Sequence, residues 1–293
     1  SSAVLVTGVT GRLPVSAGRN WRPQGRVEVG PAGKADLGRD DGAELVAVVA
    51  VVVHRVGGDA ESVVEVVHGL PFAVRLRLSA GSDRDGVPES TLATLSGPTF
   101  AREVAAGDPT AVVLAAASAA LAASLQQRLS SPTLRIYTST DLVGVELAAS
   151  LKNVIAIAAG ICQGLGLGSN TRAALIARGL AEMGRLARAM GGAEETLAGL
   201  AGLGDLVLTC TGELSRNRAL GIALGTGQSL AEAQAATPMV AEGVRTAAAA
   251  AQLAARWGVE MPILRQMHRV LFEHLAPRQA VAELMGRALR AER

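Results

Sequence analysis

From about residue 142 to the end of the chain, apolar residues recur at the three- and four-residue spacing of α-helices. Glycine-rich segments at 164–168, 202–204 and 225–227 interrupt this pattern. The helices that it predicts cover residues 143–161, 171–190, 215–224, 229–235, 244–257, 263–273 and 277–291. We therefore expect an all-α domain at residues 143–293.

The residues before this point follow a different pattern, in which short apolar runs alternate with turns. The runs that predict strands cover residues 3–6, 26–29, 45–53, 72–78 and 92–95. Residues 61–70 have a helical period. Strands that alternate with helices favour a parallel, doubly wound sheet, so we expect a Rossmann-like α/β domain at residues 1–142.

Composition excludes several classes of protein. Aromatic residues make up 2% of the chain and hydrophobic residues 49%, so the core is built from aliphatic side chains and alanine. A net charge of +2 without a basic cluster gives no reason to expect nucleic-acid binding.

Cys162 and Cys210 have neither metal-ligand nor disulfide spacing, and no metal is expected. The longest aliphatic run, residues 45–53, is too short to span a membrane, and no signal peptide is recognised. We expect a cytoplasmic protein that is not an integral membrane protein.

Lysine is rare in this chain, and one lysine lies inside an apolar helix. Of 28 lysine and arginine residues, only Lys34 and Lys152 are lysine. Arginine cannot release its proton in a protein, whereas a partly buried lysine can, so Lys152 is a candidate general acid or base. The alternative is a structural lysine that reaches the surface or forms an ion pair.

Two further segments place polar groups where ligands bind. Asp205 lies among glycines and aliphatic residues, so its carboxylate is paired, lines a site, or belongs to a turn. Ser215 is a good N-cap, and the free backbone N–H groups after it, together with Arg216, favour a phosphate or carboxylate. A simple capped helix with a solvent-facing arginine is the alternative. Asn153 can bind a substrate hydroxyl or cap a kink in the helix.

Other signals are weaker. Residues 96–100 predict a turn after a strand at the edge of the sheet where ligands bind, although a purely structural turn fits as well. Gly8 and Gly11 form an incomplete dinucleotide-binding turn that lacks the third glycine. No histidine lies between His68 and His268, which disfavours lactate-type dehydrogenases and Ser-His-Asp hydrolases.

Taken in order, a series of segments resembles the NAD(P)-dependent glycerol-3-phosphate dehydrogenases of the bacterial type. The resemblance covers roughly residues 92–288. The segments are LSGPTFAREVAAG at 95–107, LKNVIAIAAG at 151–160, AGLGDLVLTCT at 201–211, LSRN at 214–217, VAEG at 240–243, MPI at 261–263 and VLFE at 270–273.

The resemblance implies a Rossmann-like domain followed by an all-α domain like the C-terminal domain of 6-phosphogluconate dehydrogenase. It implies NAD(P)H as cofactor and a homodimer. The implied reaction is reversible hydride transfer between the nicotinamide and C2 of dihydroxyacetone phosphate, which gives sn-glycerol 3-phosphate for glycerophospholipid synthesis.

The resemblance also assigns residues. Lys152 is the proton donor and acceptor. The substrate-binding positions are Gly97, Thr99, Lys152, Asn153, Asp205, Ser215, Arg216 and Asn217. The cofactor-binding positions are Gly8, Gly11, Ala101, Arg216, Val240 and Glu242.

The segment before Ser96 departs from the family. It is shorter than the resemblance leads us to expect, and the family's Thr-Lys-Gly turn has no counterpart near residues 78–83. Two other interpretations therefore stay open. One is a non-catalytic relative with an impaired cofactor domain, and the other is a different two-domain oxidoreductase, such as a ketopantoate reductase. The segments at 151–153 and 215–217 argue against the latter.

Overall fold

The structure is a computed structural model. It describes residues 4–7, 50–53, 62–67, 74–80, 92–236, 241–289 and 291. Three predicted cofactor contacts, Gly8, Gly11 and Val240, lie outside the described residues, as do Lys34 and the strand predicted at 26–29.

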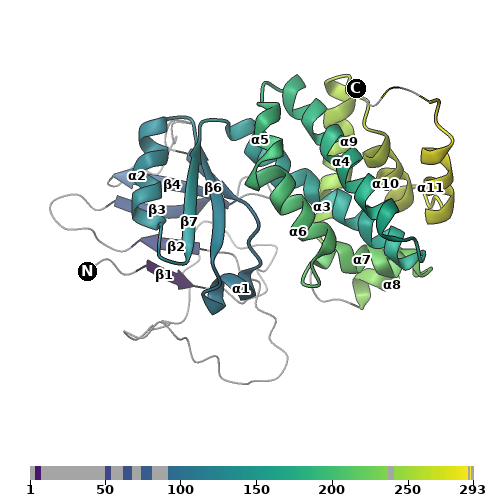
Figure 1. The fold of residues 1–293 in the computed structure, drawn as a ribbon, viewed down its shortest axis with the longest axis horizontal. Coiled ribbons are helices and arrows are strands. Elements are labelled where there is room, and N and C mark those ends of the chain that lie inside the picture. The colour runs from purple at the N-terminus through teal and green to yellow at the C-terminus, as the bar shows by residue number, and fades with distance from the viewer. Residues whose placement is uncertain are drawn as a thin grey trace, which may run out of the picture.

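The first part of the chain contains two sheets (Figure 1). A two-stranded antiparallel sheet joins β1 (Val4–Thr7) to β2 (Ala50–Val53). The larger sheet has the order β3-β4-β5-β6-β7. Its strands are β3 (Ser62–Val67), β4 (Val74–Ala80), β5 (Leu92–Ser96), β6 (Thr110–Ala116) and β7 (Leu134–Ser139). Helix α1 (Ala101–Ala106) connects β5 to β6, and α2 (Ala119–Leu129) connects β6 to β7.

The pairing of these strands is mixed. β6 and β7 are parallel, with Thr110 opposite Leu134, and the crossover between them contains α2, as a parallel pair requires. The other three pairs of the larger sheet are antiparallel. The α/β character of this half is confirmed, but its described strands do not form the all-parallel arrangement that we expected. Because β5 runs against β6, its last residue, Ser96, lies opposite Val113 in the middle of β6.

The helix predicted at residues 61–70 is wrong in the described part of that segment. Residues Ser62–Val67 form strand β3 and pair with β4. Four of these six residues are valine. Valine is stiff about its first side-chain torsion and fits a pleated strand better than a helix, so residue type outweighs the apparent helical spacing.

The second half is all helical, as predicted, and lies beside the sheet in Figure 1. Its elements are α3 (Leu142–Gly164), α4 (Ser169–Ala189), α5 (Glu194–Ala198), the π-helix η2 (Leu200–Gly204), α6 (Asp205–Thr211), α7 (Arg216–Gly225), α8 (Leu230–Ala235), α9 (Glu242–Arg256), α10 (Pro262–Phe272) and α11 (Pro277–Met285). The glycines at 202–204, which predict a break, lie within η2 and run into α6. The last helix ends at Met285, before the predicted residue 291.

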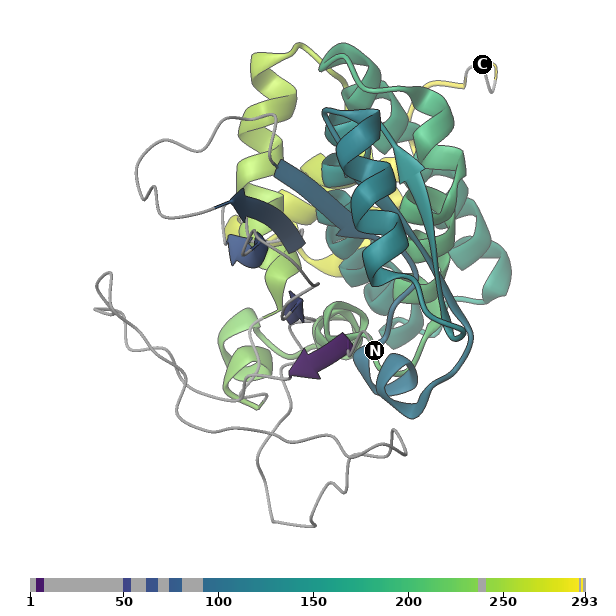
Figure 2. The same cartoon turned by 90° about the vertical axis from the view of Figure 1, so that its left-hand side faces the viewer.

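Helix α3 is the central element of this half. Figure 1 shows it between other helices, and it packs against α4, α6, α7 and α9. In Figure 2, where the sheet side faces the viewer, the helical half lies behind the sheet. Within the described part of the chain it is the one helix whose length and mean hydropathy, 1.7, would suffice to cross a membrane. However, 72% of its apolar stretch is buried inside the protein, so its place in the core accounts for this composition.

Glycines bring α7 into direct contact with α3. A Cβ atom added at Gly221 would lie 2.9 Å from the Cα of Gly160, and one at Gly225 would lie 3.0 Å from the Cα of Gly164. The four-residue spacing places each glycine pair on one face of its helix. The two backbones therefore touch, which holds the second half of α7 against the last turns of α3.

Two buried or partly buried carboxylates connect helix starts to other elements. Asp141 caps α3 by accepting the backbone N–H of Gly144 at 2.8 Å, and it also accepts the hydroxyl of Thr196 on α5 at 2.6 Å. Glu182, on α4, accepts the backbone N–H groups of Ile263 and Leu264 in the first turn of α10. Burial raises the pKa of Glu182 to about 7, despite these two hydrogen bonds. Helices distant in sequence are thus tied at their ends.

Candidate active site

Lys152 lies in the middle of α3, and its ammonium group faces the start of α6. Its Nζ donates a hydrogen bond to Oδ2 of Asp205. The side chain of Lys152 is 19% exposed, and that of Asp205 is 3% exposed. Of the alternatives for Lys152, the structure therefore has a partly buried ion pair, with the lysine open to solvent on one side.

Asp205 is the first residue of α6, where the π-helix ends. Besides Lys152, its carboxylate receives hydrogen bonds from the backbone N–H of Gly97 and, at 3.3 Å, from the hydroxyl of Thr209 one turn further along α6. Burial raises the pKa of Asp205, while Lys152 and the two other donors oppose this rise. A carboxylate held from three sides has little freedom to move, so it fixes the position of the lysine.

The loop after β5 approaches this pair from the sheet. Gly97 has φ of +151°, and a Cβ atom there would lie 3.0 Å from the Cα of Val112 on β6. Only glycine allows the loop to lie this close to the strand. The hydroxyl of Thr99 donates to the backbone carbonyl of Gly97 at 3.1 Å, and α1 begins at Ala101. The loop thus presents one backbone N–H to the site.

The start of α7 contacts α3 at Asn153, the residue after Lys152. Ser215 is the N-cap, as predicted, and its hydroxyl accepts the backbone N–H of Arg218 at 3.3 Å. Arg216 is the first residue of the helix and stays partly exposed, whereas Asn217 is buried. The arginine can therefore meet a ligand beside the helix N-terminus, where backbone N–H groups favour anions.

A chain of buried hydrogen bonds joins α3, α7 and α9. The backbone N–H of Gly243 donates to Oδ1 of Asn217 at 2.9 Å, and Nδ2 of Asn217 donates to Oδ1 of Asn153 at 3.0 Å. Nδ2 of Asn153 donates in turn to the carbonyl of Ala149 at 3.3 Å. Both asparagine amides thus hold helices together, whether or not they also meet a ligand.

Glu242, the first residue of α9, completes the group of charged residues. Its Oε1 lies 3.8 Å from Nη2 of Arg216, and the side chains of Glu242 and Arg216 are 40% and 33% exposed. Burial raises the pKa of the Glu242 carboxyl, and the charges of Arg216 and Lys152 lower it. Two cations and two carboxylates therefore meet where α3, α6, α7 and α9 converge.

Most of the predicted site residues that the structure describes are thus brought together. Ala101 and Thr99 lie on the sheet side of the group, and the Thr99 hydroxyl donates within its own loop. Sequence reasoning did not single out Thr209 or Gly243. The four-residue interval between Asp205 and Thr209, which places them on one helical face, is the signal that could have found Thr209.

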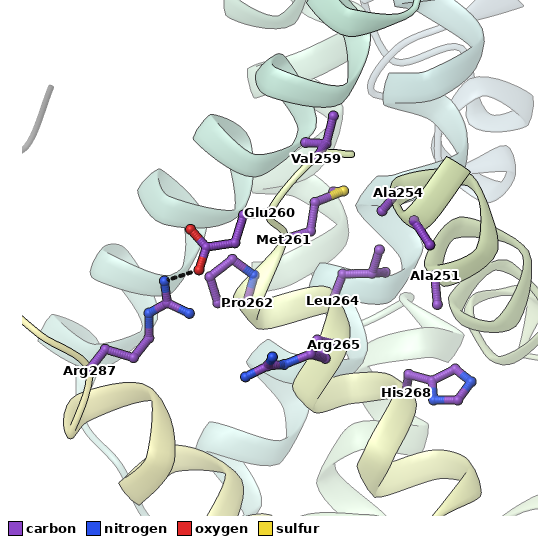
Figure 3. A pocket seen from close by; sticks show the side chains of 11 residues that line it. Ala251, Ala254, Val259, Glu260, Met261, Pro262, Leu264, Arg265, His268 and Arg287 are labelled. Carbon is purple, nitrogen blue, oxygen red and sulfur yellow. Dashed lines mark hydrogen bonds and ion pairs between the residues drawn. The ribbon is translucent and has the colours of Figure 1, made fainter. Parts of the chain in front are cut away.

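The two described cavities lie elsewhere. One, of about 290 Å³, is lined by residues at the end of α9 and the start of α10, with Arg287 opposite (Figure 3). The other, of about 440 Å³, lies between the sheet and η2 and is lined by Ala111, Val113, Tyr137 and Leu200. Among the described residues no cluster of three potential metal ligands occurs. Neither of these two cavities includes the charged group around Lys152.

Comparison with known proteins agrees with this arrangement. A family described as "NAD-dependent glycerol-3-phosphate dehydrogenase C-terminus" matches residues 141–282, and its N-terminal counterpart matches residues 46–122. The two matches, with the α/β half and the all-α half of the structure, identify a chain of the two-part NAD-dependent dehydrogenase class. A solved glycerol-3-phosphate dehydrogenase from Coxiella burnetii is 53% identical with a TM-score of 0.65, over 67% of this chain and 60% of that one.

Curated relatives are closer still. Glycerol-3-phosphate dehydrogenase [NAD(P)+] of Geobacter sulfurreducens is 61% identical over 199 residues, which are 68% of this chain and 59% of the relative. The protein of the same name from Acidobacterium capsulatum is 57% identical over 229 residues, 76% of this chain and 68% of the relative. The chain belongs to the glycerol-3-phosphate dehydrogenase family. It matches about three fifths of the length of the Geobacter relative.

Proposed function

We propose that this chain is an NAD(P)-dependent sn-glycerol-3-phosphate dehydrogenase, which interconverts dihydroxyacetone phosphate and sn-glycerol 3-phosphate. One observation carries the proposal. Lys152, which is paired with Asp205, and Arg216 both lie close enough to Glu242 for their charges to lower the pKa of its carboxyl. A proton carrier beside an anion-binding cation is what a phosphorylated ketone requires. The names and identities of the relatives support this choice of substrate.

Lys152 acts as the proton donor when the ketone is reduced and as the acceptor when the alcohol is oxidised. Its ammonium group also stabilises the negative charge that develops on the carbonyl oxygen. Asp205, held by Gly97 and Thr209, orients the ammonium group and keeps it at one position. Accurate placement of a proton donor is worth orders of magnitude in rate, because the reacting atoms must meet in one geometry.

Arg216 binds the phosphate group of the substrate, with the free backbone N–H groups at the start of α7. Ser215 shapes this helix start as its N-cap. Asn153 and Asn217 hold α3 and α7 in register and lie next to the two cations in sequence. On the sheet side, the substrate lies against the loop that contains Gly97 and Thr99. All of these roles follow the family assignment and are supported by the convergence of the residues.

The described residues also fit a nicotinamide cofactor. Glu242 offers a carboxylate acceptor, Arg216 a phosphate-binding guanidinium, and Ala101 the start of a helix beside the sheet. When bound, the cofactor supplies or accepts the hydride. Gly8, Gly11 and Val240 complete the proposed set by resemblance and lie outside the described residues.

We further propose a domain division at residues 142 and 143, where α3 begins, and a homodimer in the cytoplasm. The resemblance supports the homodimer, and the absence of disulfide spacing at Cys162 and Cys210 supports a reducing compartment. The product serves glycerophospholipid synthesis. The absence of a basic cluster supports a protein without a nucleic-acid partner, and the burial of α3 supports one that is not embedded in a membrane.

The test is the oxidation of NADPH and of NADH, followed by absorbance, with dihydroxyacetone phosphate as substrate. Ketopantoate and a 3-keto acid serve as competing substrates. We expect turnover with dihydroxyacetone phosphate and none with the acids. Preference for either acid would assign a different oxidoreductase. No turnover and no cofactor binding by fluorescence would leave the non-catalytic relative as the better description.

A further inference from the structure

Helices α7 and α9 begin side by side, and their first two residues pair in order. Arg216 faces Glu242 across 3.8 Å, and the next residues, Asn217 and Gly243, share a buried hydrogen bond of 2.9 Å. Each helix thus contributes one charged residue to the site and the following residue to the interior. The charged pair is more exposed than the buried pair beneath it.

The two helix starts cannot move apart easily. A Cβ atom at Gly243 would lie 2.7 Å from the carbonyl oxygen of Asn153 and 2.7 Å from Cδ1 of Ile157. The backbone of α9 therefore lies directly on α3, and it is bonded to α7 at the same place. Any rearrangement between Arg216 and Glu242 has to come from their side chains rather than from the helices.

The four charges at the site balance. Lys152 pairs with Asp205, and Arg216 pairs with Glu242, so these residues together present no net positive charge. A phosphate dianion that binds beside these described residues competes with a carboxylate for its cation. Asp205 is 3% exposed and accepts hydrogen bonds from three groups, whereas Glu242 is 40% exposed and lies beyond hydrogen-bond distance of Arg216. Glu242 is therefore the carboxylate that a phosphate can displace from its cation.

We propose that Glu242 is a counter-anion for Arg216 that the phosphate of the substrate displaces, and that Glu242 thereby limits the affinity of the site for phosphate. The proposal rests on the proposed function, because it takes Arg216 as the phosphate-binding residue. It goes beyond a contact between Glu242 and the cofactor, since it concerns the protein without cofactor. Glu242 is then a residue that tunes affinity through Arg216 and leaves proton transfer to Lys152.

The experiment measures binding of inorganic phosphate to the cofactor-free protein by isothermal titration calorimetry. Glu242→Gln removes the charge and keeps the size of the side chain, and Glu242→Ala is a second neutral variant. Glu242→Asp keeps the charge. Glu195→Gln is the matched control, because Glu195 is exposed on α5 and has no described partner. Turnover of dihydroxyacetone phosphate is measured in parallel.

We expect both neutral variants to bind phosphate about tenfold more tightly than the unchanged protein, because removal of a charge a few ångströms from a dianion is worth roughly this factor at a partly exposed site. Glu242→Asp and the control should stay within about threefold. In turnover, the neutral variants should show a lower KM for dihydroxyacetone phosphate without a higher kcat, since tighter ground-state binding does not stabilise the transition state.

Weaker phosphate binding in the neutral variants would overturn the proposal, because Glu242 would then orient Arg216 rather than compete for it. Unchanged binding, equal to that of the Glu195→Gln control, would overturn it as well. Both results leave the proposed function intact if the unchanged protein turns over dihydroxyacetone phosphate. Absence of that turnover is what would remove the proposed function itself.

Discussion

The Nζ of Lys152 donates a hydrogen bond to Oδ2 of Asp205, although the two residues are 53 positions apart in the sequence and lie on different helices. The contact joins the core helix α3 to the start of α6. It gives the lysine a partner whose side chain is 3% exposed and leaves the lysine side chain 19% exposed. A lysine held on one side and open on the other can exchange a proton with a bound molecule.

Replacement of Lys152 tests the proton transfer. Lys152→Ala should lower kcat for reduction of dihydroxyacetone phosphate by about 10²- to 10⁴-fold, the usual contribution of a positioned general acid. Lys152→Arg should fail nearly as badly, because arginine keeps the charge and cannot release a proton. Thermal melting verifies that both variants fold. A rate for Lys152→Arg close to that of the unchanged enzyme would contradict the proton-carrier role.

The same pair should show strong coupling in stability. Lys152→Met leaves the buried Asp205 carboxylate without its cation and should lower the free energy of unfolding by about 3 kcal/mol. Adding Asp205→Asn removes the unpaired charge, so the double variant should recover most of this loss. Urea unfolding of the two single variants and the double variant measures the coupling. Additive losses would mean that the two side chains do not depend on each other.

Glu182 should make stability depend on pH. Burial raises its pKa in the folded protein from an ordinary value of 4.5 to about 7. A carboxyl with a raised folded pKa favours folding below the unfolded pKa, and this contribution is lost as pH rises through the folded value. Relative to Glu182→Gln, the free energy of unfolding should therefore fall by about 3 kcal/mol between pH 4.5 and pH 7.5.

Urea unfolding across this pH range checks the prediction for Glu182. The variant Glu195→Gln again serves as control, because an exposed glutamate should leave the pH profile unchanged. A profile for Glu182→Gln parallel to that of the unchanged protein would show that Glu182 titrates alike in the folded and unfolded chains.

The contact between α3 and α7 should be intolerant of added atoms. In Gly221→Ala, the new Cβ would lie 2.9 Å from the Cα of Gly160, so the helices would have to separate. We expect a loss of about 2–4 kcal/mol in the free energy of unfolding. At Gly184, on α4, an added Cβ meets only the Glu194 side chain at 3.6 Å. Gly184→Ala should therefore be neutral or stabilise by up to about 1 kcal/mol, because alanine favours helices.

If both alanine variants unfold at the same urea concentration, the glycine contact between α3 and α7 is not what limits stability. If Gly221→Ala folds stably but loses phosphate affinity, the contact serves chiefly to place Arg216. Calorimetry with inorganic phosphate, run beside the urea series, separates these results.

The helical half could be predicted from the sequence because amphipathic helices repeat at 3.6 residues over long stretches. Helix α4, for example, was expected at 171–190 and is found at Ser169–Ala189. The sheet was harder. At residues 62–67 the spacing of the valines suggested a helix. Their branched side chains and the pairing with strand β4 favour a strand instead. Strand direction was not readable either, since pairing depends on distant segments.

Within the site, individual residues could be predicted better than their relationships. Lys152 stood out because lysine is rare in this chain and lies here inside an apolar helix, and Ser215 because of its cap position. Nothing local indicated that Asp205 would face Lys152, or that Asn217 would use its amide to join α3 to α9. These contacts depend on how the helices cross. Helices α3 and α7 cross at glycines, which have no Cβ atom to keep the two backbones apart.

The glycine contact has a consequence for the thermodynamics of ligand binding. Because Gly160 and Gly221 meet through their backbones, no side chain at this glycine contact has to choose a rotamer before the site is complete. Less conformational entropy between these two helices is then lost when an anion binds beside Lys152 and Arg216. A site preorganised in this way binds its ligand with a smaller entropic penalty than one assembled from flexible loops.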